Sequence, residues 1–236
     1  MPRRLHALVA VLSWAFCWLA LPAAAELTPE ALQRAASAGV VCSVCHGSEG
    51  RATNHGYFPR IAGKPEGYLY EQLLNFRDGR RHYAAMTRML QVLSDDYLRE
   101  IAAYFAAQEL PYPEPQTRGA PADVLAAGER LVRLGDPARR VPACVSCHGA
   151  AMTGVEPYVP GLVGLPRDYL NAQLGAWQTG QRHARAPDCM AAVAARLTPT
   201  DVAAVSTWLS SQPVLTGARA APGFMAPLPA PCGSVR

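Results

Sequence analysis

The feature that most constrains how this chain folds is an internal repeat. A Cys-x-x-Cys-His pentapeptide at residues 42–46 recurs at residues 144–148, an offset of 102. The match continues beyond both pentapeptides in the same order, at offsets of 101 and then 104. The paired positions include Pro59 and Pro160, Gly63 and Gly164, Tyr68 and Tyr169, Gln72 and Gln173, Arg81 and Arg182, His82 and His183, and Met86 and Met190. Because the match extends over most of both halves, we expect a duplicated domain.

A proline-rich stretch separates the two copies. Residues 111–115 read Pro-Tyr-Pro-Glu-Pro, and Gly119 and Pro121 follow shortly afterwards. Such a stretch cannot sustain a helix and is typical of a semi-rigid linker. We therefore expect one domain over residues 26–115 and a second over residues 116–212. Residues 213–236 contain five prolines and no periodic pattern, which predicts an irregular tail.

Each copy has the pattern of a small all-α domain. Thr28, Pro29 and Glu30 form a typical helix start, and residues 122–134 predict the equivalent helix of the second copy. A middle helix is expected after each duplicated glycine, and a final helix from Ser94 and from Thr198. No alternation typical of strands is present. Each half has a thin apolar core for an independent domain, so a large apolar prosthetic group would stabilise it.

The N-terminus has the layout of a secretory signal peptide. Arg3 and Arg4 precede an apolar stretch from Ala7 to Leu21, and small residues end at Ala25. The apolar stretch is shorter than the roughly 20 residues that a spanning helix needs. We expect residues 1–25 to be a signal peptide, cleaved near Ala25 on export to the periplasm.

The charge of the mature chain is small. Cleavage after residue 25 removes two arginines and no acid, which lowers the formal charge from +4 to +2. This composition does not favour a polyanionic partner, and we expect no nucleic acid binding.

The spacing of the cysteines and histidines predicts haem. Cys-x-x-Cys-His is the attachment signature of c-type haem, in which two thiols bond to the porphyrin and the histidine binds the iron. We expect Cys42 and Cys45 to bind one haem and Cys144 and Cys147 a second. The iron ligands on this side would be His46 and His148. An all-thiolate zinc site or two disulfides would use the same cysteines, but neither needs the two histidines.

A duplicated methionine is the candidate for the sixth iron ligand. Met86 lies 40 residues after His46, and Met190 lies 42 residues after His148. Methionine opposite histidine raises the potential of a haem that transfers electrons. His82 and His183 are the rival ligands, because they are duplicated too.

Two prolines are placed to orient the proximal histidines. Pro59 and Pro160 follow His46 and His148 by 13 and 12 residues. We expect their backbone carbonyls to accept the second N–H of each imidazole, which orients the ring and raises its basicity.

These motifs resemble the dihaem class I cytochromes of the cytochrome c4 family. The resemblance covers nearly the whole mature chain and includes the Val-Pro-Ala-Cys sequence that begins at Val141. It implies two tandem class I cytochrome c domains with two covalently bound haem c groups. It also implies a periplasmic carrier with peripheral membrane association. The donor would be a cytochrome bc complex or a dehydrogenase, and the acceptor a terminal oxidase or reductase.

The chain departs from the family pattern at Cys189 and Cys232. These are the two cysteines left in the mature chain once the haem cysteines are assigned, so we expect a disulfide between them. The alternative is that the Cys189 thiolate replaces Met190 on the iron, which would lower the potential steeply.

Two protein ligands on each iron leave no coordination site for a substrate, so we expect an electron carrier and not an enzyme. Two alternatives remain: a dihaem subunit of a larger oxidoreductase, and an enzyme similar to the thiosulfate dehydrogenases. The second alternative needs a cysteine or an exchangeable ligand at one iron.

Overall fold

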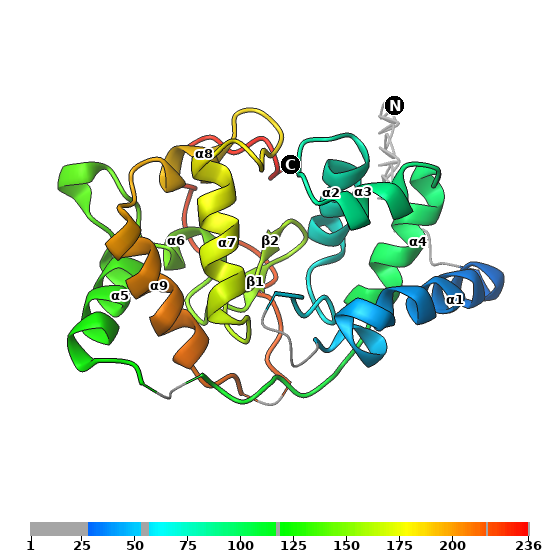
Figure 1. Ribbon diagram of the computed structural model, residues 1–236, viewed down its shortest axis with the longest axis horizontal. Helices are drawn as coiled ribbons and strands as arrows, with labels where there is room; N and C mark the ends of the chain where they lie inside the picture. The colour runs from blue at the N-terminus through cyan, green and yellow to red at the C-terminus, as the bar shows by residue number, and fades with distance from the viewer. Residues whose placement is uncertain (1–27, 53–56, 117–118, 216, 236) are drawn as a thin grey trace, which may run out of the picture.

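The computed structural model describes residues 28–52, 57–116, 119–215 and 217–235 (Figure 1). The predicted signal peptide, residues 1–25, lies outside the described residues. None of the helices within these ranges combines the length and the hydropathy that crossing a bilayer requires.

The first half of the described chain is helical. Its elements are α1 (Pro29–His46), the 3₁₀ turn η1 (Ser48–Gly50), α2 (Glu66–Arg77), α3 (Ala84–Leu90) and α4 (Asp95–Ala106). Polar caps begin two of these helices where the sequence predicts them. The Thr28 hydroxyl accepts from the Ala31 N–H at 3.2 Å, and the Ser94 hydroxyl accepts from the Tyr97 N–H at 3.3 Å.

The second half repeats this plan. Its elements are α5 (Ala122–Leu134), the 3₁₀ turn η2 (Pro137–Arg139), α6 (Val145–His148), α7 (Arg167–Gln178), α8 (Cys189–Ala194) and α9 (Pro199–Ser211). Thr198 and Asp201 form a capping box at the start of α9, in which each side chain accepts from the backbone N–H of the other residue. The predicted middle and final helices are therefore confirmed in both halves, and so is the all-α fold class.

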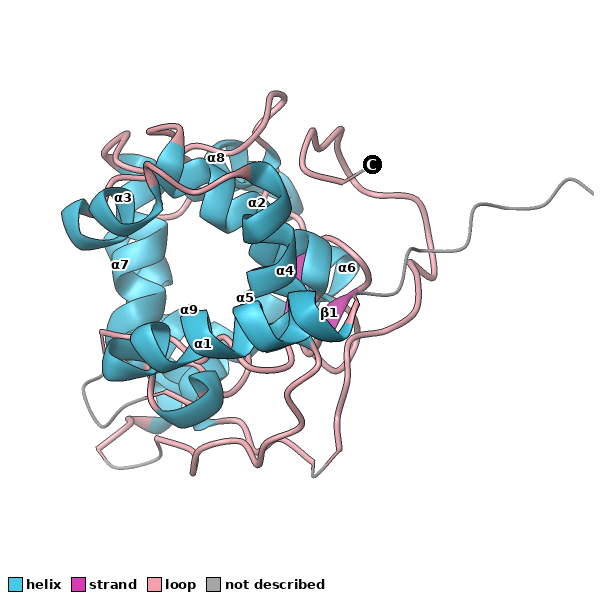
Figure 2. Cartoon of the chain, turned by 90° about the vertical axis from the view of Figure 1, so that its right-hand side faces the viewer, coloured by secondary structure: helices cyan, strands magenta, loops and turns pink. Residues whose placement is uncertain are grey.

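Three local features differ from the sequence expectation. A hairpin of two short strands, β1 (Gly154–Val155) and β2 (Val159–Pro160), lies in the second half (Figure 2). The short helices α3 and α8 are too brief to give a clear periodic pattern. In the first half α1 runs through the Cys-x-x-Cys-His motif. In the second half α5 ends at Leu134, because Gly135 with its φ of 68° caps the helix, and the motif forms a separate turn at α6.

Each half has its own hydrophobic cluster built on its final helix. In the first half Leu98 and Phe105 of α4 are almost fully buried. In the second half Trp208 and Leu209 of α9 pack against Leu131 of α5. These clusters hold the helices that carry the repeated motifs, and Figure 1 shows the two sets of helices side by side.

Backbone and side-chain hydrogen bonds join the two halves. The His82 N–H donates to the Gln181 carbonyl at 2.9 Å, and the His183 N–H donates to the Arg80 carbonyl at 2.6 Å. Arg185 forms an ion pair with the buried carboxylate of Glu71 at 2.7 Å. The halves therefore contact each other along the turns that follow α2 and α7.

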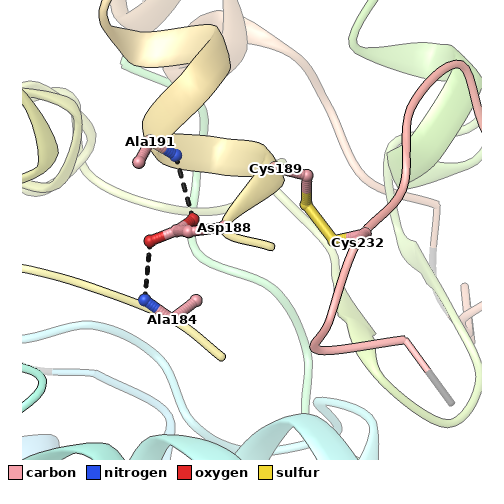
Figure 3. The surroundings of a disulfide bond; sticks show 5 residues. All are labelled: Ala184, Asp188, Cys189, Ala191 and Cys232. Carbon is pink, nitrogen blue, oxygen red and sulfur yellow. Dashed lines mark hydrogen bonds between the residues drawn. A yellow bond between two sulfur atoms is a disulfide. The ribbon is translucent and has the colours of Figure 1, made fainter. Parts of the chain in front are cut away.

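The C-terminal tail packs against the second half. Within its described residues it forms no helix. The Ala221 N–H donates to the Gly154 carbonyl, and the Glu156 N–H donates to the Ala221 carbonyl, which joins the tail to the hairpin. A disulfide between Cys189 and Cys232 ties the end of the tail to the first residue of α8 (Figure 3). The predicted disulfide is confirmed.

Asp188 organises the backbone beside this disulfide. Its carboxylate accepts from the Ala191 N–H at 3.0 Å and from the Ala184 N–H at 2.7 Å, as Figure 3 shows. The first of these bonds caps α8. The covalent link and the cap together fix the segment that carries Met190.

A glycine on α5 allows this helix to approach α9 closely. A Cβ atom at Gly128 would overlap the carbonyl oxygen of Ala204 and lie 2.7 Å from the Cβ of Trp208. We predict that Gly128→Ala lowers stability by about 1–3 kcal/mol through overpacking. Gly175→Ala on α7 is the matched control, because a Cβ there has no neighbour within 4 Å, and we expect a gain of about 0.5–1 kcal/mol. Thermal unfolding of the purified protein checks both. Equal midpoints for the two variants would contradict the close packing.

The disulfide closes a loop between positions 43 residues apart. In the chain-entropy model such a cross-link stabilises the fold by about 4 kcal/mol. We predict that Cys232→Ser lowers the thermal midpoint and that thiol alkylation of the unreduced wild-type protein labels no cysteine at 189 or 232. Peptide mass spectrometry checks the labelling. Two labelled thiols would show that the bond does not form.

Candidate haem sites

All the predicted site residues face one apolar cavity. The cavity has a volume of about 640 Å³ and is lined by residues from both halves and from the tail. The predicted site residues among its lining are Cys42, Cys45, His46, Met86, Cys144, Cys147, His148 and Met190. The structure therefore brings each Cys-x-x-Cys-His motif into one space with the methionine that the sequence pairs with it.

The two motif histidines are buried and held in the same way. His46 is 9% exposed and His148 is 7% exposed. Nδ1 of His46 lies 2.9 Å from the Pro59 carbonyl oxygen, and Nδ1 of His148 lies 2.8 Å from the Pro160 carbonyl oxygen. With Nδ1 donating to a carbonyl, Nε2 is left free to bind a metal. The predicted role of the two proline carbonyls is confirmed.

Burial favours the neutral form of both imidazoles. Desolvation lowers the pKa of His46 and of His148, and it outweighs the hydrogen bonds to the proline carbonyls, which act in the opposite direction. A nearby cation adds to the lowering in each case: Arg81 for His46 and Lys64 for His148. A neutral imidazole is the form that binds iron.

The four motif cysteines are not paired with one another. All are free thiols in this structure. Burial raises the pKa of Cys144 to about 11 and raises the pKa of Cys42 as well. Among the described residues no group of three or more histidine, cysteine or acidic side chains is arranged to hold a metal ion. The geometry does not favour the zinc and disulfide alternatives.

The two methionines lie on corresponding short helices. Met86 is on α3 and packs against the first hydrophobic cluster, and Met190 is on α8 beside the disulfide. Both are half-buried, whereas the side chains of His82 and His183 are exposed. This favours methionine as the sixth ligand. The ligand set itself stays a prediction.

Cys189 is engaged in the disulfide with Cys232. Its sulfur is therefore not free to act as a thiolate ligand. The alternative in which Cys189 replaces Met190 on the iron is contradicted by this pairing.

Two buried arginines meet beside the cavity. Arg81 is 8% exposed and Arg182 is 6% exposed, and they form an isolated backbone bridge between the two halves. Each guanidinium donates to the side-chain oxygens of both Gln72 and Gln173, at 2.6–3.0 Å. Arg81 also donates to the hydroxyl of Tyr169 at 3.0 Å. The two arginines therefore donate to neutral acceptors, which are the side chains of Gln72, Gln173 and Tyr169.

This arrangement is electrostatically costly without an anion. Burial and the charge of Arg81 lower the pKa of Arg182. Burial alone would raise the pKa of Tyr169, but the two guanidinium groups outweigh it and lower that pKa below its usual value. Two like charges in a desolvated site need a neutralising group.

Haem c fits these residues. It needs two thiols for its vinyl groups, a neutral imidazole for its iron and an apolar surrounding for its ring, and both halves supply all three. Each haem also carries two propionates, which are the anions that the buried arginine pair lacks. The sequence repeat includes both arginines in its duplicated Gly-x-Arg turn. The pattern alone does not show that the two side chains lie next to each other.

Known proteins similar to this chain agree with the geometry. No protein-family profile matches the chain. A thiosulfate dehydrogenase electron acceptor of Thiomonas intermedia is 37% identical over 214 residues, which cover 90% of this chain and 93% of that protein. Cytochrome c4 of Pseudomonas aeruginosa is 36% identical over 171 residues, which cover 72% of this chain and 82% of that protein.

A solved structure shares the fold. Thiosulfate dehydrogenase TsdBA of Marichromatium purpuratum superposes with a TM-score of 0.67 and 34% sequence identity. The match covers 77% of this chain and 40% of that chain. One part of that dehydrogenase therefore resembles the present protein.

The cytochrome c4 relatives, the duplicated helical fold and the two histidine-bearing motifs on one apolar cavity support a single conclusion. The chain belongs to the cytochrome c4 family and is a dihaem c-type cytochrome that transfers electrons through two covalently bound haem c groups.

Proposed function

We propose that this chain accepts electrons, one at each haem, from a thiosulfate dehydrogenase and passes them to a terminal oxidase or reductase. The observation that carries the proposal is the 37% sequence identity to a thiosulfate dehydrogenase electron acceptor, over an alignment that covers 93% of that protein. The structural similarity to part of TsdBA supports the same donor.

The proposed haem-binding residues divide into two equivalent sets. Cys42 and Cys45 would hold the first haem covalently, with His46 and Met86 as its iron ligands. The second set is Cys144, Cys147, His148 and Met190. The haem supplies an iron centre that takes up and releases a single electron.

The protein residues set the conditions for this electron transfer. The proline carbonyls orient the two histidines, and the apolar cavity walls exclude water from the ring. A methionine ligand and a histidine ligand on each iron would raise the potential and would leave no coordination position open. A closed sphere leaves no position for a substrate, so the proposed role is that of a carrier and not of an enzyme.

The buried arginine pair would link haem binding to the contact between the two halves. Arg81 and Arg182 belong to different halves and share the same two glutamine acceptors. Carboxylates placed there by either haem would be neutralised by charges from both halves. This contact would hold the two haem-bearing halves in a fixed relation.

The proposed setting is the periplasm. Residues 1–25 would direct export and be cleaved, leaving domains over 26–115 and 116–212 and the tail over 213–236. The pairing of Cys189 with Cys232 supports an oxidising compartment.

A second candidate donor is a quinol-oxidising cytochrome bc complex. It is the donor that the resemblance to the cytochrome c4 family implies, and the 36% identity to cytochrome c4 of Pseudomonas aeruginosa supports that resemblance. In both cases the chain is the carrier, and the two proposals differ in the protein that reduces it.

The donor is tested by reduction in solution. The oxidised holoprotein is mixed with thiosulfate and a catalytic amount of a purified thiosulfate dehydrogenase, and haem absorbance is followed. We expect rapid reduction of both haems, and no reduction when the dehydrogenase or thiosulfate is omitted. A cytochrome that stays oxidised with the dehydrogenase, but is reduced by a quinol and a bc complex, would reject the first donor in favour of the second.

The sixth ligands are tested by substitution. We predict that Met86→His and Met190→His each lower the potential of one haem steeply and remove half of the methionine-to-iron charge-transfer absorption, because imidazole is a harder ligand than thioether. Met89→Leu is the matched control, since Met89 lies one turn from Met86 on α3 but is exposed. A stepwise optical redox titration checks this. A shift with Met89→Leu and none with Met86→His would refute the assignment.

A further inference from the structure

The end of the tail packs against the cavity and not against the hydrophobic core. Its cavity-lining residues include the apolar side chains Leu228, Pro229, Ala230 and Val235. The hydrophobic cluster of the second half, by contrast, includes none of the described residues after Val214. Residues 228–235, the cover segment, therefore form part of the cavity wall without contributing to the packing that holds the helices together.

Two adjacent residues fix the cover segment beside the predicted iron ligand Met190. Cys232 is bonded to Cys189, the residue before Met190, as Figure 3 shows. The Gly233 N–H donates to the Pro187 carbonyl at 2.9 Å. A Cβ atom at position 233 would overlap the carbonyl oxygen of Ala186, so this close approach requires glycine.

The chain between the hairpin and these two residues does not hold itself in place. Ala221 is hydrogen-bonded to the hairpin, but Met225 is 96% exposed, so the tail leaves the surface before it returns to the cavity. Residues 227, 229 and 231 are prolines, which have no backbone N–H to donate. The position of the cover segment therefore depends on Cys232 and Gly233.

The first half cannot form the same attachment. At the repeat offset of 104, the position that corresponds to Cys189 is Ala85, which precedes Met86 and is exposed. An alanine has no thiol to bond to another segment. The two predicted methionine ligands therefore lie in similar short helices but differ in what is fastened beside them.

We propose that the disulfide-linked cover segment restricts the access of exogenous iron ligands to the haem held by His148 and Met190. A nitrogen base can replace a methionine on a ferric iron only when the site opens locally. At the second haem the cover segment would also have to move away. The inference rests on the proposed ligation by Met190, and it makes the second iron less accessible than the first to small bases and anions.

The test follows the replacement of methionine by free imidazole at low concentration in the ferric holoprotein. Loss of the methionine-to-iron charge-transfer absorption reports the reaction, and the phase of the second haem is the one that is missing in Met190→His. We expect this phase to be the slower one in the wild type. Cyanide is smaller than imidazole, so we expect the difference between the two haems to be smaller with cyanide.

Two kinds of variant release the cover segment. Cys189→Ser combined with Cys232→Ser removes the disulfide and leaves no free thiol beside Met190. We expect it to accelerate the second-haem phase by about tenfold or more and to leave the first-haem phase unchanged. Gly233→Ala displaces the segment with the disulfide intact, and we expect a change in the same direction. Gly223→Ala is the matched control, because a Cβ there has no neighbour within 4 Å.

Other outcomes overturn the proposal. Equal rates at the two haems in the wild type would show that the segment excludes nothing. An equal difference between the haems for cyanide and imidazole would mean that the disulfide holds the Met190 segment and does not cover the cavity. Acceleration of both phases together with a lower thermal midpoint would indicate a general loss of stability. If Met190→His removes neither phase, the proposed ligand set itself is wrong, whereas a failure of the cysteine and glycine variants alone leaves that assignment in place.

Discussion

The hydrogen bond from each buried imidazole to a proline carbonyl is the interaction on which the site depends. It fixes the ring of His46 and of His148 and directs the second nitrogen of each into the apolar cavity. Desolvation lowers the pKa of both imidazoles and so favours the neutral form, which is the form that binds iron. Helices α1 and α6 end at the two histidines, and the loops that follow bring the prolines back within hydrogen-bonding distance of the imidazoles.

Buried positive charges lie at the interface between the halves. Arg81 and Arg182 are buried together on neutral acceptors, and Lys64 extends from one half to the backbone beside the other half's histidine. In the protein without haem this arrangement would lower the stability of the fold, because buried like charges repel each other. The propionates of two haems would convert it into a stabilising contact. In that case the cofactors and the interface between the halves would stabilise each other.

Much of the fold could be predicted from the sequence because its signals are local. Thr28, Ser94 and Thr198 mark helix starts through side-chain caps, and the repeat fixes corresponding elements in both halves. The proline carbonyls follow from spacing alone. The contacts between the halves could not be predicted in this way, since no periodic pattern in one sequence shows that Arg81 meets Arg182 or that Lys64 reaches Gly161. The short helices α3 and α8 are too brief to be recognised by their periodicity, and α8 begins at a residue of the disulfide.

The central claim is that this one chain binds two haems covalently, one in each half. Intact mass spectrometry of the denatured mature protein, produced in a host with a working cytochrome c assembly system, tests it most directly. We expect a mass equal to the chain plus two haems, with tryptic peptides containing residues 42–46 and 144–148 each carrying one. A chain that bears no haem, or a single haem on one peptide, would contradict the account.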